Sequence, residues 1–126
     1  ANLRGAILDE ASLTGARLLT ADLTGARLVG ADLTAAELYH TKLSDASLDA
    51  ADLSDANLAG ADLTGATLDY ADLSRTLGLN ADQLVAARPD TTTQLPADMA
   101  TDPRVVERIR QVTDASAGQS GRCVEK

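Results

Sequence analysis

The sequence of 126 residues predicts an all-β solenoid, in which the chain turns a corner every five residues and stacks coil upon coil. Three observations predict this fold class. Leucine recurs at every fifth position from Leu3 to Leu73, fifteen times without a gap. Alanine stands two residues before fourteen of these leucines, and Thr41 is the exception. With two Tyr and neither Phe nor Trp, the chain must fill its interior with leucine and alanine, which indicates a narrow and regular core.

A period of five fits neither standard element, because a helix repeats every 3.6 residues and a strand every two. On a helix these leucines would spiral around all sides, and on a flat strand they would alternate between faces. A corner every five residues keeps each leucine pointing inward. The alanine two positions earlier points inward as well, because the two-residue alternation holds within each short extended side.

The repeating unit reads Ala-(Asp/Asn)-Leu-x-x, as in Ala21-Asp22-Leu23-Thr24-Gly25, and it resembles the pentapeptide-repeat family. The resemblance covers residues 1 to about 76. It implies a right-handed quadrilateral β-helix of just under four coils, with four five-residue sides per coil. Residues twenty apart then stack at ~4.8 Å, the spacing between paired strands.

The repeat breaks at residues 76–79, where a C-terminal cap is expected. Asn80 and Gln83 form a capping-box pattern that starts a short helix over 81–88, which Pro89 stops. Leu84 and Val85 are expected to cover the last coil. The domain boundaries are therefore 1–76 for the β-helix, 77–113 for the helical cap and a second short helix, and 114–126 for a disordered tail.

Asp102 and Pro103 predict the start of the second helix. Its apolar face packs on the cylinder or the cap, or else binds a second copy or a partner. That face consists of Val105, Val106, Ile109 and Val112.

The N-terminal end shows no capping segment, because Ala1 is already in register with the repeat. The first coil would then expose its four leucines, and an upstream segment of a longer parent protein or an end-on interface with another subunit is expected to cover them. These leucines are Leu3, Leu8, Leu13 and Leu18.

Motifs for chemistry are missing from the sequence. It has no zinc-ligand spacing, phosphate-binding loop or nucleophile elbow, and the lone His40 is expected to be a surface residue. The single Cys123 excludes an intrachain disulfide. We therefore predict no enzyme activity and no cofactor. The net charge of −8 argues against direct nucleic-acid binding, and no apolar run is long enough for membrane contact by this segment.

Stacking at a spacing of twenty residues predicts a ladder of carboxylates, Asp32, Asp52 and Asp72, on one side of the cylinder. The ladder is either a solvated surface, since Asp is the common residue before Leu in the repeat, or a cation site or phosphate mimic. On other sides, Lys42 falls between Asp22 and Asp62, and Arg17 stacks over Glu37.

Exposed apolar residues give a second candidate site. Leu19, Tyr39 and Ala59 are predicted to form one outward column, with Arg17 and His40 beside it. Val29 is placed on an adjacent side. Tyr and Leu together in one column indicate a recognition patch for a protein.

The sequence therefore predicts a non-catalytic protein-interaction or scaffold module, a domain of a larger bacterial protein in the cytoplasm or the soluble domain of a membrane protein. Its partner is an unidentified protein, or a second copy bound through the N-terminal end or the C-terminal helix. The alternative is an acidic mimic of DNA that regulates DNA gyrase, a role that the resemblance implies for some family members. Against it, the cylinder is only ~18 Å tall at the spacing of paired strands, and it lacks the Phe that those members place inward.

Overall fold

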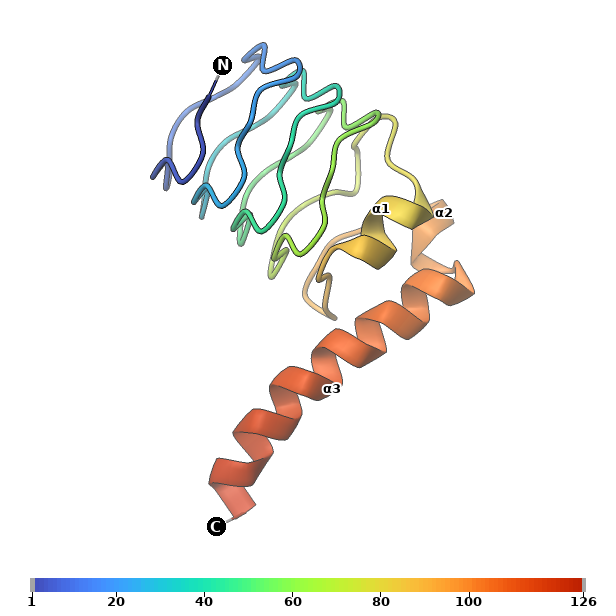
Figure 1. Ribbon diagram of the computed structural model, residues 1–126. Helices are drawn as coiled ribbons and strands as arrows, with labels where there is room; N and C mark the ends of the chain where they lie inside the picture. Colours follow the sequence, from blue (N-terminus) through green and yellow to red (C-terminus); the bar gives the residue numbers. More distant parts are fainter. Residues whose placement is uncertain (1, 126) are drawn as a thin grey trace.

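The computed structural model describes the backbone of residues 2–125 and the side chains of residues 2–115. Parallel bridges join residues 20 positions apart, in four columns that begin at Asn2, Ile7, Ser12 and Arg17. Each coil therefore has four sides of five residues each. Figure 1 shows the coils stacked from the blue N-terminal end toward the helices at the C-terminal end.

The corner between two sides is a tight turn whose third residue has a left-handed backbone. In the first turn, the N–H of Ala6 donates to the carbonyl of Leu3 at 3.0 Å, and Gly5 has a φ of 67°. A positive φ at this position is what a type II turn requires. Every fifth residue from Gly5 to Tyr70 has a positive φ, so this one turn sets the period of the whole cylinder.

The Asp or Asn that precedes each leucine stabilises the turn that follows it. The carboxylate of Asp22 accepts hydrogen bonds from the N–H of Thr24 at 3.1 Å and from the Thr24 hydroxyl at 2.6 Å. Asp62 accepts the same pair from Thr64, at 3.0 and 2.6 Å. Such local bonds are the reason that Asp and Asn favour turns, and they explain why the repeat prefers these residues at an outward position.

The core is a column of leucine and alanine along the cylinder axis. Every repeat leucine from Leu23 to Leu73 is at most 2% exposed, and burying each one contributes ~2 kcal/mol before entropy is counted. Thr41, which replaces an alanine, is fully buried, and its hydroxyl donates to the carbonyl of Leu18 at 2.7 Å. The one exception among the repeat alanines therefore has a hydrogen-bonded hydroxyl.

Helix α1 (Ala81–Ala86) closes the C-terminal end of the cylinder. The capping box between Asn80 and Gln83 is present, as predicted. The Gln83 amide also donates to the carbonyls of Leu58 and Ala61 at 2.7 and 3.0 Å, groups at the end of the last complete coil. Leu84 is fully buried against the core, whereas Val85 is 36% exposed on the other face of the helix.

The solenoid pairing continues past residue 76, where the sequence analysis places its boundary. Arg88 bridges to Thr67 and Gln94 bridges to Asp72, at spacings of 21 and 22 residues instead of 20. Helix α1 accounts for the first extra residue, because it replaces one extended side of this last coil. The second lies between Arg88 and Gln94, a stretch one residue longer than a repeat side. It ends at Ala86 instead of residue 88, since the N–H of Arg88 donates to the carbonyl of Ala66 at 2.9 Å and returns the chain to the sheet edge.

Helix α2 (Ala97–Ala100) leads into helix α3 (Pro103–Glu125), which packs on α1. The Asp102 carboxylate accepts the N–H of Arg104 at 2.8 Å at the start of α3, in agreement with the sequence. Val105 and Val112 are buried and Ile109 packs against the core. Val106, expected on the same face, is 49% exposed instead, because it lies one residue, about 100° of helical turn, from Val105.

Helix α3 continues through residues 114–125, where the sequence analysis predicts a disordered tail. Extending a formed helix costs far less than starting one, so the well-anchored first turns propagate into a segment whose glycines and serines are poor helix formers by themselves. Figure 1 shows this half of α3 projecting away from the cylinder. No helix within residues 2–125 combines the length and apolar composition that a membrane crossing requires.

Candidate interaction surfaces

The predicted column of Leu19, Tyr39 and Ala59 is formed by consecutive coils at one corner of the cylinder. The N–H of Thr20 donates to the carbonyl of Tyr39 at 3.0 Å, and the N–H of His40 donates to that of Ala59 at 3.0 Å. Leu19 is 42% exposed and Tyr39 is 37% exposed. Two large apolar side chains therefore lie one above the other at the surface.

Tyr39 and His40 are held against the coil below them. The amide of Asn57 donates to the Tyr39 hydroxyl at 2.6 Å, which holds the phenol ring along the side of the cylinder. The His40 imidazole lies over Gly60, where an added Cβ would collide with its Nδ1. A rigid, exposed aromatic side chain costs little entropy on binding, which is why Tyr is common at the centre of interfaces.

Leu77 extends this apolar surface and was not singled out in the sequence. It bridges to Asn57, the residue that holds Tyr39, and is 54% exposed. The spacing of twenty residues from Asn57 could have placed it here, but it lies where the repeat breaks. We call the surface formed by Leu19, Tyr39, His40, Ala59 and Leu77 the Tyr39 surface.

Of the two other residues predicted for this patch, only Arg17 lies on the same side. Arg17 bridges to Glu37, and its guanidinium lies 3.6 Å from the Glu37 carboxylate. Val29 lies instead in the column of Asp9, whose carboxylate accepts the Val29 N–H at 3.2 Å. Ten residues separate Val29 from Tyr39, half of a 20-residue coil, so Val29 is on the opposite side and not on an adjacent one.

The carboxylates of Asp32, Asp52 and Asp72 stack in one column through parallel bridges. Each accepts the backbone N–H of the residue two positions further on at 3.0 Å. In the case of Asp32, the hydrogen bonds from Thr34 lower the pKa of the carboxylate below its usual value. The carboxylates are thus engaged in the turns, and no group of three or more His, Cys, Asp or Glu among the described residues has the geometry to hold a metal ion.

A second acidic column, not foreseen from the sequence, runs through Asp49, Asp69 and Asp90. Burial, followed by the charges of Asp90 and Asp49, raises the pKa of Asp69 to about 6. The N–H of Asp69 also donates to the Asp49 carboxylate at 3.2 Å. Asp90 reaches this column through the irregular chain after α1, so the five-residue period gives no sign of it.

The first coil is less covered than the others. Leu3, Leu8, Leu13 and Leu18 are only partly buried, although they pack against the core. Within residues 2–125, the backbone N–H groups of Ile7, Ser12 and Arg17 have no backbone partner. This end of the cylinder therefore presents both apolar side chains and free donors along a sheet edge.

Comparison with known proteins identifies the repeat. The family model for pentapeptide repeats matches with 8 copies, over residues 1–34, 11–49 and 41–77. The chain belongs to the pentapeptide-repeat family. No curated protein sequence matches it significantly.

Solved structures of pentapeptide-repeat proteins share its fold. One from the thylakoid lumen of Arabidopsis thaliana is 22% identical, with 87% of this chain and 88% of that chain covered and a TM-score of 0.61. Rfr23 from the cyanobacterium Cyanothece 51142 is 31% identical, with 75% and 56% covered and a TM-score of 0.56.

Pentapeptide-repeat proteins form right-handed quadrilateral β-helices, in keeping with the four columns of bridges in this chain. The family match indicates no catalytic class. What distinguishes this pentapeptide-repeat protein is the set of side chains at outward positions. The Tyr39 surface brings three exposed large apolar side chains together there, those of Leu19, Tyr39 and Leu77.

Proposed function

We propose that this chain is a non-catalytic protein-interaction module that binds a protein partner on the Tyr39 surface. The observation that supports the proposal most is the hydrogen bond from Asn57 to the Tyr39 hydroxyl at 2.6 Å, which holds an exposed ring in place between the exposed side chains of Leu19 and Leu77. Flat solenoid sides with such anchors are typical docking surfaces.

Site-specific photo-cross-linking tests this proposal in cells of the source organism. A photoreactive phenylalanine analogue at Tyr39 is expected to give a discrete cross-linked species. The same analogue at Ser47, on the opposite side of the cylinder, is the matched control. The double variant Leu19→Asp, Tyr39→Asp should abolish partner binding and leave the circular dichroism spectrum unchanged, since both side chains point outward.

Cross-linking that is equal at positions 39 and 47, or binding that survives the double variant, would refute the proposed surface. The proposal also includes the wider prediction of a scaffold domain in a larger bacterial protein of the cytoplasm. A partner found at position 39 would identify the assembly that this domain serves.

We further propose that the first coil takes part in an end-on contact with another β-coil. Its partly buried leucines and the free N–H groups of Ile7, Ser12 and Arg17 support this, because an unpaired edge is a template for further strand pairing. Light scattering across a concentration series is the test. A dimer that the variant Ile7→Pro or Ser12→Pro dissociates supports an end-on contact, and a strict monomer at all concentrations excludes self-association.

The alternative of a DNA mimic that acts on gyrase is supported by the charge of the cylinder alone. Residues 1–76 carry twelve acidic and five basic residues, and the lowered pKa values of Asp22, Asp32 and Asp62 keep those carboxylates ionised. A supercoiling assay decides this alternative: no inhibition of gyrase at micromolar protein would exclude it.

A further inference from the structure

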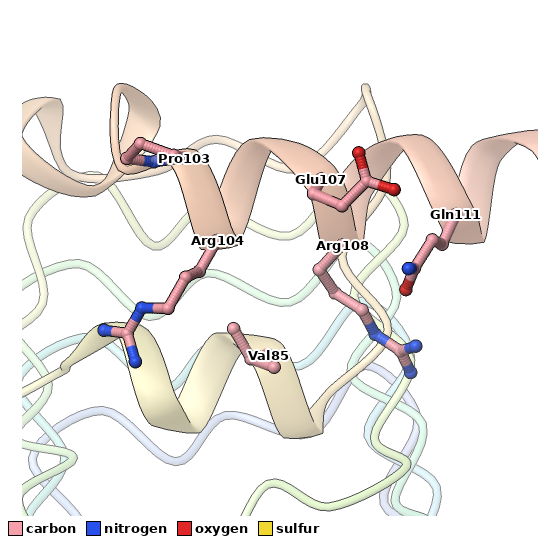
Figure 2. A pocket seen from close by; sticks show the side chains of 6 residues that line it. All are labelled: Val85, Pro103, Arg104, Glu107, Arg108 and Gln111. Carbon is pink, nitrogen blue, oxygen red and sulfur yellow. The ribbon is translucent and has the colours of Figure 1, made fainter.

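An open cleft of about 420 Å³ lies between α1 and the first half of α3. Figure 2 shows Val85 rising from α1 toward α3, while Arg104, Arg108 and Gln111 extend from α3 to the side of α1. Glu107 points away from α1 in the same view. The volume is within the range of ~300–1,000 Å³ that ligand sites occupy.

Among the side chains that the structure describes, Arg108 is the cationic group of this cleft without an anionic partner. Its Nε donates to the carbonyl of Ala87 at 2.9 Å, which fixes the plane of the guanidinium. Among the side chains of residues 2–115, no carboxylate lies within salt-bridge distance of Arg108. Its two terminal nitrogens are therefore free to hold a carboxylate through two parallel hydrogen bonds.

The other charges of the cleft are already compensated. Arg104 pairs with Asp82 at 2.8 Å across the start of α1. Glu107 accepts the Nε of Arg110 at 3.1 Å on the outer side of α3. What remains in the cleft is one positive charge, in a chain whose net charge is −8.

Apolar and neutral polar groups stand beside that charge. Val85 is 36% exposed and forms the floor on α1. Gln111 lies one helical turn beyond Arg108 on α3, and its amide can donate to and accept from a peptide backbone. A fixed cation, an aliphatic floor and an amide together suit a short peptide better than a bare inorganic anion.

We propose that the α1–α3 cleft binds an acidic peptide segment of a partner protein, with a carboxylate on Arg108 and the neighbouring aliphatic side chain on Val85. The cleft shares no residue with the Tyr39 surface. The inference is therefore independent of the proposed function and would stand if that surface had no partner.

The test is an NMR titration of the full chain with a blocked tetrapeptide of alternating leucine and glutamate. Saturable shifts are expected at the amide signals of Val85, Arg108 and Gln111. The matched peptide, with glutamine in place of glutamate, should give none. Inorganic phosphate and succinate are titrated separately as small anions without an aliphatic side chain, and neither should reproduce the saturation.

Three variants locate the site. Arg108→Gln is expected to weaken peptide binding about tenfold or more, the loss typical of a charge-assisted hydrogen-bond pair. Val85→Glu should weaken peptide binding as much, because its carboxylate repels that of the peptide. This variant keeps the hydrogen bond from Arg108 to Ala87, and so it tests the site even if Arg108→Gln disturbs the packing of α3. Arg75→Gln removes the same charge from a repeat coil, where Arg75 pairs with Asp55 outside the cleft, and should bind the peptide unchanged.

Three results would overturn the proposal. Equal weakening by Arg75→Gln would mean that the peptide responds to the overall charge of the chain without a specific site. Equal saturation by phosphate or succinate would make the cleft a small-anion site. Binding that persists in both Val85→Glu and Arg108→Gln would place the peptide elsewhere on the molecule.

Discussion

The repeat coils and the C-terminal cap solve the same problem, the burial of a leucine column, in two different ways. In the coils, one turn recurs at every fifth residue from Gly5 to Tyr70, and each contact has many equivalents above and below it. In the cap, single residues carry several contacts: Gln83 completes the capping box and also donates to two carbonyls of the last coil. The comparison teaches that repetition sets the geometry of the cylinder, whereas its end depends on individual side chains.

The largest effect is expected from leucine truncation at different depths in the cylinder. Leu53→Ala removes a side chain with no exposure in the middle of the stack, and should lower the free energy of unfolding by about 2–5 kcal/mol. Leu13→Ala in the partly buried first coil should cost less than half as much, because its site is already open to solvent. Urea denaturation of both variants measures the difference. Equal losses would mean that the first coil is covered in solution.

The next effect concerns two glycines with positive φ, one in each region. At Gly78 an added Cβ would lie 2.8 Å from the Cβ of Ala59 and 2.9 Å from its backbone, whereas at Gly25 nothing lies within 4 Å. Gly25→Ala should therefore cost only the left-handed backbone penalty less the unfolded-state entropy that alanine removes, roughly 0.5 kcal/mol net. Gly78→Ala adds a steric clash and should cost about 2–4 kcal/mol.

Thermal melting of the two glycine variants at one pH checks the prediction. A lower melting temperature for Gly78→Ala than for Gly25→Ala supports the view that the cap depends on single close contacts. The reverse order would show that the chain around residue 78 can move away from Ala59 at little cost.

A smaller, pH-dependent effect is expected where the cap meets the coils. The pKa of Asp69 is raised to about 6 from an ordinary value of 3.8, so the folded state binds this proton more tightly than the unfolded state does. The stabilisation of the folded state by this proton on Asp69 is complete below pH 4 and is lost as the pH rises through 6. Asp69→Asn should therefore raise the melting temperature at pH 7.5 by a few degrees and change it little at pH 4.

Asp32→Asn is the control with the opposite sign. Hydrogen bonds from Thr34 lower the pKa of Asp32, so its contribution is present above the unfolded pKa and is lost as the pH falls below it. Asparagine keeps the turn acceptor, and the variant should be slightly less stable than the parent protein at pH 7.5. Melting curves of Asp69→Asn that parallel those of the parent protein at both pH values would contradict the raised pKa of Asp69.

The same contrast decides how much could be predicted from the sequence. The leucine period predicts the inward residues and the stacking of positions twenty apart, as in Lys42 between Asp22 and Asp62, because one local turn repeats. The period ends at residue 76, and beyond it each position depends on contacts made once. Arg88 rejoins the sheet at a spacing of 21 residues because a helix replaces one side, and Gln94 at a spacing of 22 because the next side is one residue longer.

The candidate sites divide in the same way. Tyr39 and Leu19 lie within the period, and their common column could be derived from it. Leu77, twenty residues after Asn57, could also be placed by the period. The Arg108 cleft could not, because it depends on where α1 and α3 pack on the last coil. The period could also have placed Val29 correctly, since it lies ten residues from Tyr39, which is half of a 20-residue coil.

The smallest expected effect is a stabilisation within the coils. Ala50 holds a left-handed backbone with a φ of 61°, which costs an L-residue about 1–2 kcal/mol. Ala50→Gly removes this strain but adds about 0.4–1 kcal/mol of unfolded-state entropy, so the net gain should be roughly 0.5 kcal/mol. Ala59→Gly, at the turn position just before a left-handed residue, has no such strain to relieve and should be destabilising. Urea denaturation measures the free energy of unfolding of both variants. Changes of opposite sign would show that the repeated corners carry backbone strain that a glycine can remove. Equal losses would mean that the corner at Ala50 is not strained by alanine.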